Sequence, residues 1–526
     1  MKKLLSLVIT AALFCTVFSA VSLAEETPTL TYWCLFENNA SKSVNNYADL
    51  PLYKELMTRL GINIKFTHPP TGMDAEQFAL LIAGSELPDI IEYNWYGSYP
   101  DGPQAAIDEG VIIPLNEYLE NGSLPNLAKM FAEDPDLAAT CRTYEGTYYC
   151  FPFVRSNELM KQKGGGPTIR MDVLDQLGLD VPRTIDDWEE VFAKAQEAGW
   201  EHPFIARFAD LHGNSSATTG EESVFCGAYG VAYRFYIEDG TIKFGPIEPA
   251  YKDYLAKMAD WYSKGYIDPD FLTLDNSGLD GKMTSSSAMS TFRSPDSGIG
   301  VWTKNMRAVD ENVRFVAAPF PVLNEGDTRY IGNMNLRFQA GYSAAITTSC
   351  KNIDAALKLL DYAYSEEGNL LYNFGIEGVS FEYDENGEAQ FTKLITDNPD
   401  GLTLKEAMIL YCRNSAGGPF VKDAGPILAQ RHDNKDQYDA PFIWDASIDW
   451  SKCLPRMVYT AEETEELNDI MAEVNTILEE MTVKIIIGDK SIGTYDDYVS
   501  DMKNAEIDRA IQIIQTAYDR QTGVNQ

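Results

Sequence analysis

Short segments with the period of a strand alternate with segments of helical period through the amino-terminal part of the chain. Apolar side chains recur at every second residue over 62–66, and residues 29–35 and 89–93 also have the pattern of strands. Residues 52–60 and 75–83 carry helical spacing instead, and each of these runs stops at a glycine. This β-α-β-α order predicts a parallel sheet with helices packed on its faces.

A second α/β unit follows, and the chain is too long for a single hydrophobic core. A helix predicted at 184–198 starts with a capping box, in which Thr184 is the N-cap and Asp187 follows three residues later. A length of 526 residues predicts two lobes. We place the first lobe at 25–152 plus 338–398 and the second at 153–337 plus 399–526, which ends in an all-helical tail.

The amino terminus has the pattern of a secretory signal peptide. Two lysines precede an apolar run at 4–18, and residues 22–24 (SLA) offer small side chains where signal peptidase cleaves. We expect residues 1–24 to direct export and to be removed, which places the protein outside the cell or at its surface. A lipid anchor on Cys15 is not expected, because the bulky Phe14 before it fits a lipidation signal badly.

The chain is strongly acidic, with 79 Asp and Glu residues against 42 Lys and Arg and a net charge of −37. A nucleic-acid-binding protein needs a basic footprint, and an anionic membrane surface would repel this chain. The motifs GxSxG, HExxH, GxxxxGK[ST] and GxGxxG are absent, and the four histidines have no metal-like spacing. We therefore expect no nucleic-acid partner, no metal and no cofactor.

Residues 372–387, YNFGIEGVSFEYDENG, contain the most distinctive turns of the sequence. Gly375 ends a helix, the period falls to two over 379–383, and the DENG turn leads to a return strand at 390–394. Further segments with characteristic turn chemistry are GSELPDII (84–91), DEGVIIPLNEYL (108–119), TYEGTYYCFPF (143–153) and LPRMVYTAEE (454–463). In number, order and spacing, these segments resemble the large extracellular solute-binding proteins of bacterial ABC importers. The nearest group is the oligosaccharide-type, LipO-like and alginate-binding-protein-like lipoproteins.

The resemblance implies a two-lobed periplasmic-binding-protein fold, type II-like, which closes over its ligand by a hinge motion. It implies a monomer that captures an oligosaccharide and delivers it to the permease subunits of an ABC transporter. Two alternatives stay open: a secreted glycoside hydrolase or lyase, and the same fold binding a peptide or another small polar solute. The resemblance argues against an enzyme, so no catalytic residues are expected. Residues 199–210 lack the oxygen ligands of the calcium loop that alginate-binding relatives carry here.

In two-lobed α/β binding proteins the ligand lies at the carboxyl ends of strands, where loops of both lobes meet. Aromatic rings in such loops can stack on sugar faces, and amide and charged groups can bind hydroxyls. The predicted ligand-binding residues are Trp33, Glu37, Asn38, Asn94, Trp95, Tyr96, Phe153, Arg155, Trp302, Asn335, Arg337 and Trp444.

Two tryptophans and one arginine have the most specific predicted roles. Trp95 follows the strand at 89–93, and Trp302 follows a strand predicted at 298–301, where an exposed indole has no packing role. We expect the two indoles to line the interlobe cleft from opposite lobes, each stacking on a sugar ring. Arg155 either pairs with a uronate carboxylate or braces the hinge.

A disulfide between Cys141 and Cys150 is predicted from hairpin geometry. With residues 145–146 as a two-residue turn, the two cysteines are directly opposite at a non-hydrogen-bonded site. Cα atoms at such sites lie about 4.5 Å apart, within the range of about 4.4–6.8 Å that a disulfide accepts. Export makes oxidation possible, whereas a longer turn would shift the register and separate the pair.

Overall fold

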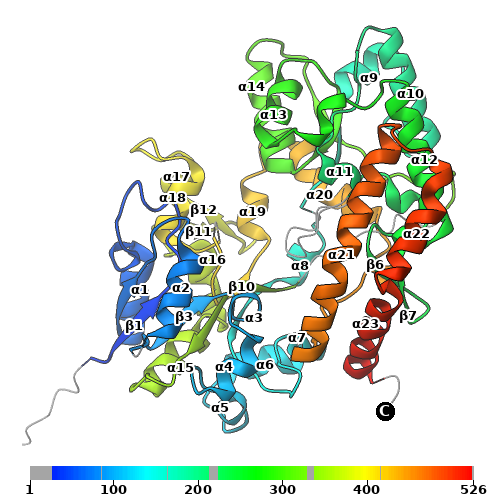
Figure 1. The fold of residues 1–526 in the computed structure, drawn as a ribbon. Coiled ribbons are helices and arrows are strands. Elements are labelled where there is room, and N and C mark those ends of the chain that lie inside the picture. The colour runs from blue at the N-terminus through cyan, green and yellow to red at the C-terminus, as the bar shows by residue number, and fades with distance from the viewer. Residues whose placement is uncertain are drawn as a thin grey trace, which may run out of the picture.

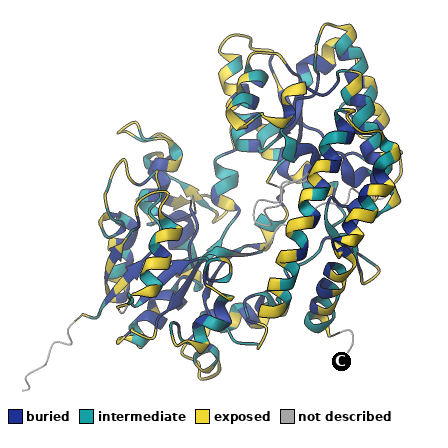
Figure 2. Ribbon diagram, viewed as in Figure 1, coloured by how far each residue is buried: buried dark blue, intermediate teal, exposed yellow. Residues whose placement is uncertain are grey.

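The computed structural model describes residues 27–523, except 85, 163, 213–222, 328–336 and 415. Figure 1 shows two lobes, and each has its own hydrophobic core. The core of the first lobe draws on residues 30–154 and 338–420, and that of the second on 169–320 and 440–513. Figure 2 shows the buried residues concentrated in the strands and on the inner faces of the helices. The predicted two-lobed α/β architecture is confirmed.

A six-stranded sheet, in the order β13-β4-β10-β3-β1-β2, forms the centre of the first lobe. Its strands are β1 (Thr29–Trp33), β2 (Asn63–Thr67), β3 (Ile90–Tyr93), β4 (Phe151–Arg155), β10 (Phe338–Ile346) and β13 (Val421–Lys422). Five of them run parallel, and β10 is antiparallel to both of its neighbours. The sheet is therefore mixed rather than wholly parallel, because β10 enters from the second lobe and not through a helical crossover on the sheet.

Helices and one small hairpin pack around this sheet (Figure 1). The helices are α1 (Pro51–Leu60), α2 (Asp74–Ala83), α3 (Trp95–Ser98), α4 (Gly102–Asp108), α5 (Asn116–Glu120), α6 (Pro125–Glu133), α7 (Pro135–Thr140), α15 (Ile353–Tyr362), α16 (Glu366–Phe374), α17 (Lys393–Thr396) and α18 (Leu404–Tyr411). The hairpin joins β11 (Phe381–Tyr383) to β12 (Ala389–Phe391), in the segment where the sequence predicts a turn.

The second lobe contains a three-stranded antiparallel sheet in the order β8-β5-β9 and a separate hairpin. The strands are β5 (Gly166–Arg170), β8 (Ser290–Arg293), β9 (Phe315–Ala317), β6 (Phe235–Glu238) and β7 (Thr241–Phe244). The helices are α9 (Met171–Leu177), α10 (Ile185–Glu197), α11 (Phe208–His212), α12 (Pro249–Ser263), α13 (Asn276–Thr284), the π-helical turn η5 (Pro295–Gly300), α14 (Val301–Arg307) and α20 (Lys435–Ala446). The capping box predicted for α10 is present, with Thr184 and Asp187 bonded in both directions.

The helical tail consists of α21 (Ala461–Ile486), α22 (Tyr495–Asn504) and α23 (Ile507–Thr522). Figure 1 shows α21 running from the second lobe down towards α7 of the first. Buried positions recur on one side of α21 at Ile470, Val474, Leu478, Met481 and Ile485, which is the helical period of an amphipathic face. Across the described ranges, no helix combines the length and apolar character needed to span a bilayer.

The chain passes between the lobes three times: after β4 through α8 (Asn157–Met160), before β10, and after β13 through α19 (Gly425–Ala429). The last passage lies later than predicted. Ile409 and Phe420 belong to the core of the first lobe, and β13 pairs with β4. The predicted boundary at residue 398 is therefore wrong, since the first lobe continues to Lys422.

The predicted register of the hairpin at 141–150 is also wrong. Arg142 bridges Tyr148, and the N–H of Thr143 donates to the carbonyl of Thr147 at 2.9 Å. Tyr144 therefore belongs to the turn, in which Gly146 has the left-handed φ of 85°. The extra turn residue shifts the pairing by one position, and the thiols of Cys141 and Cys150 are both free and buried.

We expect all seven described cysteines to resist alkylation in the native protein. They are buried and not joined in disulfides, and burial raises the pKa of six of the thiols: Cys34, Cys141, Cys150, Cys226, Cys350 and Cys412. Intact-mass analysis of residues 25–526 after iodoacetamide should show little label under native conditions and seven adducts in denaturant without reductant. A shortfall of two adducts in denaturant would show that a disulfide forms.

Candidate functional site

The carboxyl ends of the five parallel strands lie at one edge of the first sheet. The amino end of β10 lies at the same edge, because this strand runs antiparallel to the others. Glu37 and Asn38 follow β1, residues 94–96 follow β3, Arg155 ends β4, and Arg337 precedes β10. We call this edge and the loops that follow it the first-lobe edge. The fold therefore gathers the residues that were predicted from separate loops of the first lobe.

Two tryptophans at the first-lobe edge turn inward. Trp33 is 4% exposed, and its ring packs edge-on against Tyr93 with centroids 5.5 Å apart. Trp95 is 0% exposed, its Nε1 donates to the carbonyl of Ile91 at 3.2 Å, and Phe78 contacts its ring. The prediction that Trp95 presents an exposed indole is wrong, because α3 begins at this residue and directs the ring into the first core.

The two tryptophans predicted from the second lobe are also core residues. Trp302 is 1% exposed, and its Nε1 donates to Oδ1 of Asp280 at 3.2 Å. Residues 298–301 do not form the predicted strand but belong to η5 and the start of α14, which turns the indole into the second core. Trp444 on α20 is 0% exposed and lies against Gly166, where an added Cβ would meet the indole at 2.5 Å.

Three predicted residues at the first-lobe edge have structural partners. The side chain of Asn94 caps α3 by accepting a backbone N–H bond at 3.1 Å. The ring of Tyr96 is covered by the guanidinium of Arg456, which lies 4.2 Å from the ring centroid. Arg337 forms an ion pair with Asp134. These contacts hold the edge together and bring the segment before α21 against the first lobe.

Glu37, Asn38 and Arg155 remain as polar side chains with no side-chain hydrogen bond or ion pair to another described residue. Asn38 is exposed, whereas Glu37 and Arg155 are half-buried. Burial lowers the pKa of the Arg155 guanidinium. Asn335, which was predicted beside them, lies outside the described residues.

A buried ion pair lies below the first-lobe edge. Nη2 of Arg413 donates to Oε1 of Glu92 at 2.8 Å, and the hydroxyl of Tyr32 donates to the other carboxylate oxygen at 2.9 Å. Arg413 also donates to the hydroxyl of Tyr53, and its guanidinium lies 5.2 Å from the ring centroid of Tyr47. Burial raises the pKa of Glu92, while Arg413 opposes the rise. The network joins β1, β3, α1 and the loop after α18 in one cluster.

The sequence reasoning missed this pair, since its partners are 321 positions apart. One signal was present: Glu92 is the one charged residue of the segment 90–93, whose other residues are isoleucines and a tyrosine. A charge in a strand that is buried on both faces needs an opposite charge beside it. The identity of the partner could not follow from local pattern, because many arginines were available.

Tyr342 on β10 is a second residue that the sequence reasoning missed. Its ring is half-buried and lies edge-on to Phe153, with centroids 5.8 Å apart and an interplanar angle of 80°. Gly417 lies against the ring so closely that an added Cβ would be 2.3 Å from it. Arg413 donates to the carbonyl of Gly417 and so anchors this support to the buried ion pair. Phe153 is 6% exposed and serves as packing for Tyr342 rather than as a free surface.

The second sheet presents charged groups at the end nearest the connections between the lobes. There Gly166 begins β5 and is paired with Arg293, the last residue of β8. Arg293 donates to Oδ2 of Asp280 at 2.9 Å and also to Oδ1 of Asn276, which accepts a bond of 3.0 Å from Arg207 as well. The arrangement places two guanidinium groups around one amide oxygen.

A further charged contact ties the last connection to the second lobe. Arg431, between α19 and α20, donates to both carboxylate oxygens of Asp296 at 2.8 and 2.9 Å. Gln437 on α20 donates to the same carboxylate at 3.1 Å. Although burial opposes the effect, Arg431 lowers the pKa of Asp296. Asp296 is thereby held as an anion at the start of η5, on the side of the second lobe next to the connections.

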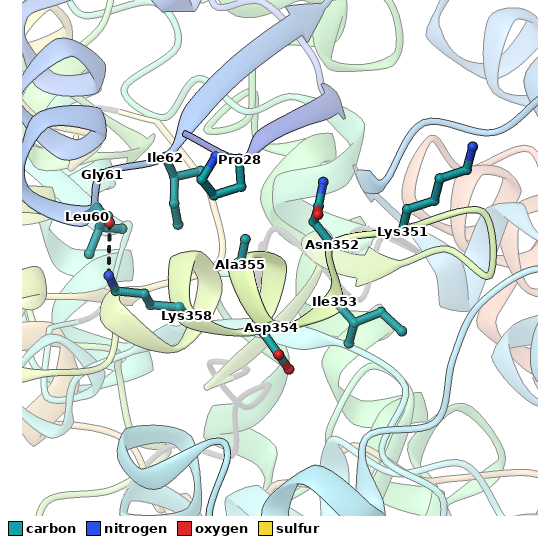
Figure 3. A pocket seen from close by; sticks show the side chains of 10 residues that line it. All are labelled: Pro28, Leu60, Gly61, Ile62, Lys351, Asn352, Ile353, Asp354, Ala355 and Lys358. Carbon is teal, nitrogen blue, oxygen red and sulfur yellow. Dashed lines mark hydrogen bonds between the residues drawn. The ribbon is translucent and has the colours of Figure 1, made fainter. Parts of the chain in front are cut away.

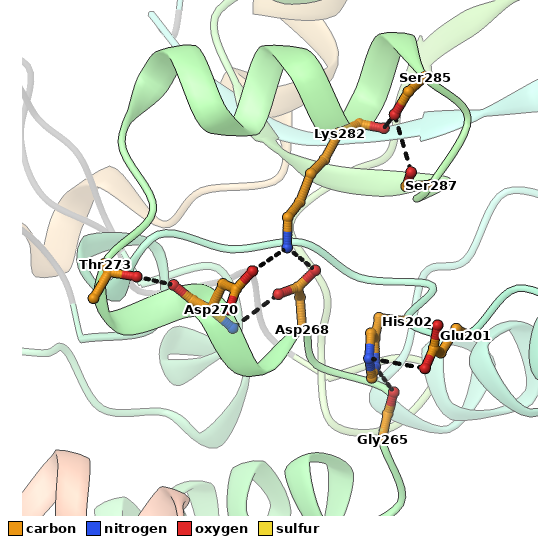
Figure 4. Close-up of polar contacts among 9 residues, drawn as sticks. All are labelled: Glu201, His202, Gly265, Asp268, Asp270, Thr273, Lys282, Ser285 and Ser287. Atoms are coloured by element: carbon orange, nitrogen blue, oxygen red, sulfur yellow. Dashed lines mark hydrogen bonds and ion pairs between the residues drawn. The ribbon is translucent and has the colours of Figure 1, made fainter.

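Carboxylates elsewhere in the second lobe are neutralised by a lysine. Figure 4 shows Lys282 reaching from α13 to Asp268 and Asp270, with Nζ–O distances of 2.6 and 2.7 Å. In the same view His202 contacts the carbonyl of Gly265 at 2.8 Å. Within the described ranges, no group of three or more His, Cys, Asp or Glu side chains is arranged to hold a metal ion.

A hollow of about 560 Å³ lies away from the first-lobe edge (Figure 3). It is bordered by Pro28 and Ile62, which precede β1 and β2, and by the first turn of α15. These positions are at the amino ends of the parallel strands. The hollow at the amino ends of the strands and the first-lobe edge are therefore separate surfaces of the same lobe.

Two α/β lobes, joined by three passages of the chain and carrying polar groups at the ends of their sheets nearest those passages, define a protein of the two-lobed ligand-binding class. Residues 46–370 match the family described as bacterial extracellular solute-binding protein. The chain belongs to that family, which confirms the resemblance seen in the sequence.

Relatives and a solved structure extend the match over nearly the whole chain. The fructooligosaccharide ABC transporter substrate-binding protein FusA of Streptococcus pneumoniae is 23% identical over 495 residues, which cover 89% of this chain and 86% of FusA. Lipoprotein LipO of Bacillus subtilis is 22% identical and covers 69% of each chain. An ABC-transporter-associated, HMO-binding solute-binding protein of Bifidobacterium longum infantis superposes with a TM-score of 0.76 at 18% identity, over 94% of this chain and 99% of that one. This last similarity establishes the fold.

Proposed function

We propose that this protein captures an oligosaccharide between its two lobes and delivers it to the permease of an ABC importer. The observation that carries the proposal is the first-lobe edge, where Glu37, Asn38 and Arg155 have no side-chain partner among the described residues and the half-buried Tyr342 packs against Phe153 of β4. Aromatic faces and hydrogen-bonding groups in one place suit sugar rings, which have apolar C–H faces and hydroxyl rims. The name of FusA, which matches 89% of the chain, supports the same ligand class and transport role.

The proposed contacts come from both lobes. From the first lobe, Glu37 and Asn38 bind hydroxyl groups and Tyr342 stacks on a sugar ring. From the second lobe, Arg293 and Asp296 approach the other side of the ligand when the lobes close. The lobes close by rotating about the three connections. The Arg431–Asp296 pair keeps the last of these connections attached to the second lobe.

The partner is the membrane permease, which recognises the closed form, and the protein acts as a monomer without catalytic activity. The net charge of −37 supports the absence of a nucleic-acid partner. The pattern of residues 1–24 supports export, and the context of Cys15 supports the absence of a lipid anchor. Residues 1–24, which include Cys15, lie outside the described residues.

A thermal-shift screen of residues 25–526 against oligosaccharides and peptides of matched size tests the proposal. A ligand at 100 times its Kd adds about 2.7 kcal/mol to the free energy of unfolding, which produces a clear rise in Tm. We expect such a rise with at least one oligosaccharide and with no peptide. A rise with peptides alone would refute the ligand class, and release of shorter sugars from the bound oligosaccharide would refute the absence of catalysis.

Replacing Tyr342 by alanine should weaken binding of that oligosaccharide by several-fold to tenfold and leave the Tm of the free protein nearly unchanged. Stacking on an aromatic ring contributes about 0.5–1.5 kcal/mol beyond burial, and Tyr342 is only half-buried. Isothermal titration calorimetry measures the change, and Tyr342→Phe should retain most of the affinity. Tyr383→Ala, which removes an exposed tyrosine from β11, is the matched control and should bind like the parent. Parent-like affinity of Tyr342→Ala would remove Tyr342 from the site.

A further inference from the structure

Two cationic side chains stand next to each other at the first-lobe edge. β4 and β13 are parallel neighbours, and their register pairs Arg155 with Lys422. The bond from the N–H of Ser156 to the carbonyl of Lys422, 2.9 Å long, fixes this register. Residues paired across neighbouring strands project from the same face of a sheet, so the guanidinium and the ammonium emerge side by side. Both residues are half-buried.

Neither cation has a carboxylate partner among the described residues. Several other buried or half-buried arginines of this chain, which has 79 acidic residues, are paired with carboxylates. The pairs are Arg170 with Asp172, Arg207 with Asp210, Arg413 with Glu92, and Arg431 with Asp296. Burying a charge is unfavourable unless an opposite charge accompanies it. Two adjacent cations without an opposite charge therefore form a site where an anionic ligand can supply that charge.

The charged neighbours of Lys422 leave the cation uncompensated. Burial, followed by repulsion from Arg155 and Lys405, lowers the pKa of Lys422 to about 8, against weaker opposing effects of the Cys412 thiol and Glu37. The next residue, Asp423, lies beyond the end of β13, and its carboxylate lies near Glu158 and Ser156. Asp423 is not among the groups with the largest effects on the pKa of Lys422.

The same face of the sheet carries the aromatic surface. Phe153 lies two residues before Arg155 on β4 and so projects from the same face, where it contacts Tyr342. A sugar ring stacked on Tyr342 would have its substituents near the cations. A guanidinium fork binds two oxygens of one acid group, and an ammonium adds a point charge.

We propose that Arg155 and Lys422 form an anion subsite for an acidic sugar ring, which carries either the carboxylate of a uronic acid or a sulfate ester. The inference rests on the proposed function and narrows its ligand to acidic oligosaccharides. The recognised chemistry is a group with at least two oxygens that share a negative charge.

Calorimetric titration with oligouronates, sulfated oligosaccharides and neutral oligosaccharides of equal length tests this subsite. The parent should bind one of the acidic series at least tenfold more tightly than the neutral series. Lys422→Met and Arg155→Met should each lose most of that preference and keep their residual affinity for neutral sugars. Since each change removes an uncompensated charge, the Tm of the free protein should not fall. Lys54→Met, which removes an exposed lysine of α1, is the control and should behave like the parent.

The pH dependence of affinity gives a readout that a purely structural role would not produce. Because Lys422 has a pKa of about 8, its protonated fraction falls between pH 7 and 9. The affinity of the parent for the acidic oligosaccharide should fall about tenfold over this range, in proportion to that fraction. Lys422→Arg keeps its charge and should bind with little dependence on pH.

The outcomes separate the two proposals. Equal or tighter binding of neutral oligosaccharides, or an unchanged acidic preference in both methionine variants, would overturn the anion subsite and leave oligosaccharide capture intact. Failure of every oligosaccharide to bind would overturn both. A preference for the carboxylate or for the sulfate series identifies which acid group occupies the subsite.

Discussion

Replacing Arg413 by methionine is expected to lower the free energy of unfolding of the first lobe by about 3–5 kcal/mol. The substitution leaves the carboxylate of Glu92, which is 3% exposed, without its cation. It also removes the donor that holds the carbonyl of Gly417 beneath Tyr342. Urea unfolding with peptide-resolved thiol labelling measures the effect, because Cys34 reports the first core and Cys226 the second.

Two comparisons make this result specific to the buried pair. Adding Glu92→Leu to Arg413→Met should restore much of the lost stability, since no uncompensated charge then remains. Arg509→Met, which breaks the pair with Glu466 where both side chains are nearly half exposed, should change stability little. A loss below about 1 kcal/mol in Arg413→Met would contradict the assigned role of the pair.

Replacing Trp95 by alanine should cost about 3–5 kcal/mol of first-lobe stability, because the indole is fully buried and the cavity left behind cannot collapse completely. The indole N–H bond to Ile91 and the contact with Phe78 are lost as well. The same labelling experiment applies, and Cys34 should become reactive at a lower urea concentration while Cys226 is unaffected.

Trp200→Ala provides the matched control for this change, since Trp200 is a half-buried tryptophan of the second lobe. Its replacement should destabilise the protein less and should not alter the labelling of Cys34. If Trp95→Ala kept full stability and lost ligand binding, the indole would be a ligand contact after all, and its packed position would not represent the free protein.

The sequence predicts the fold well where residues close together in the chain determine the local structure. The capping box at Thr184, the helix stop at Gly375 and the hairpin turn at 384–387 all depend on neighbouring residues. In that turn, Asp384 accepts the N–H of Asn386, and Gly387 has a positive φ of 82°. Alternation of strands and helices then suffices for the α/β class.

The candidate site was predicted less well, because it depends on the direction of side chains. The position of Trp95 after a buried strand places its backbone at the first-lobe edge, but the start of α3 turns the ring into the core. Glu92 and Arg413 meet only in three dimensions, and so do Arg155 and Lys422. In the hairpin at 141–150, a single additional turn residue shifted the register, which sequence spacing cannot decide.

Hydrogen–deuterium exchange of the protein with and without its best oligosaccharide shows whether the ligand is captured between the two lobes. Binding there predicts slower exchange in both lobes together: at residues 35–39, 94–98, 153–160 and 421–425 of the first lobe and its connections, and at 293–300 of the second. The amino ends of the strands, near Pro28 and Ile62, should exchange at unchanged rates. Protection confined to one lobe, or located near Pro28 and Ile62, would contradict capture between the lobes.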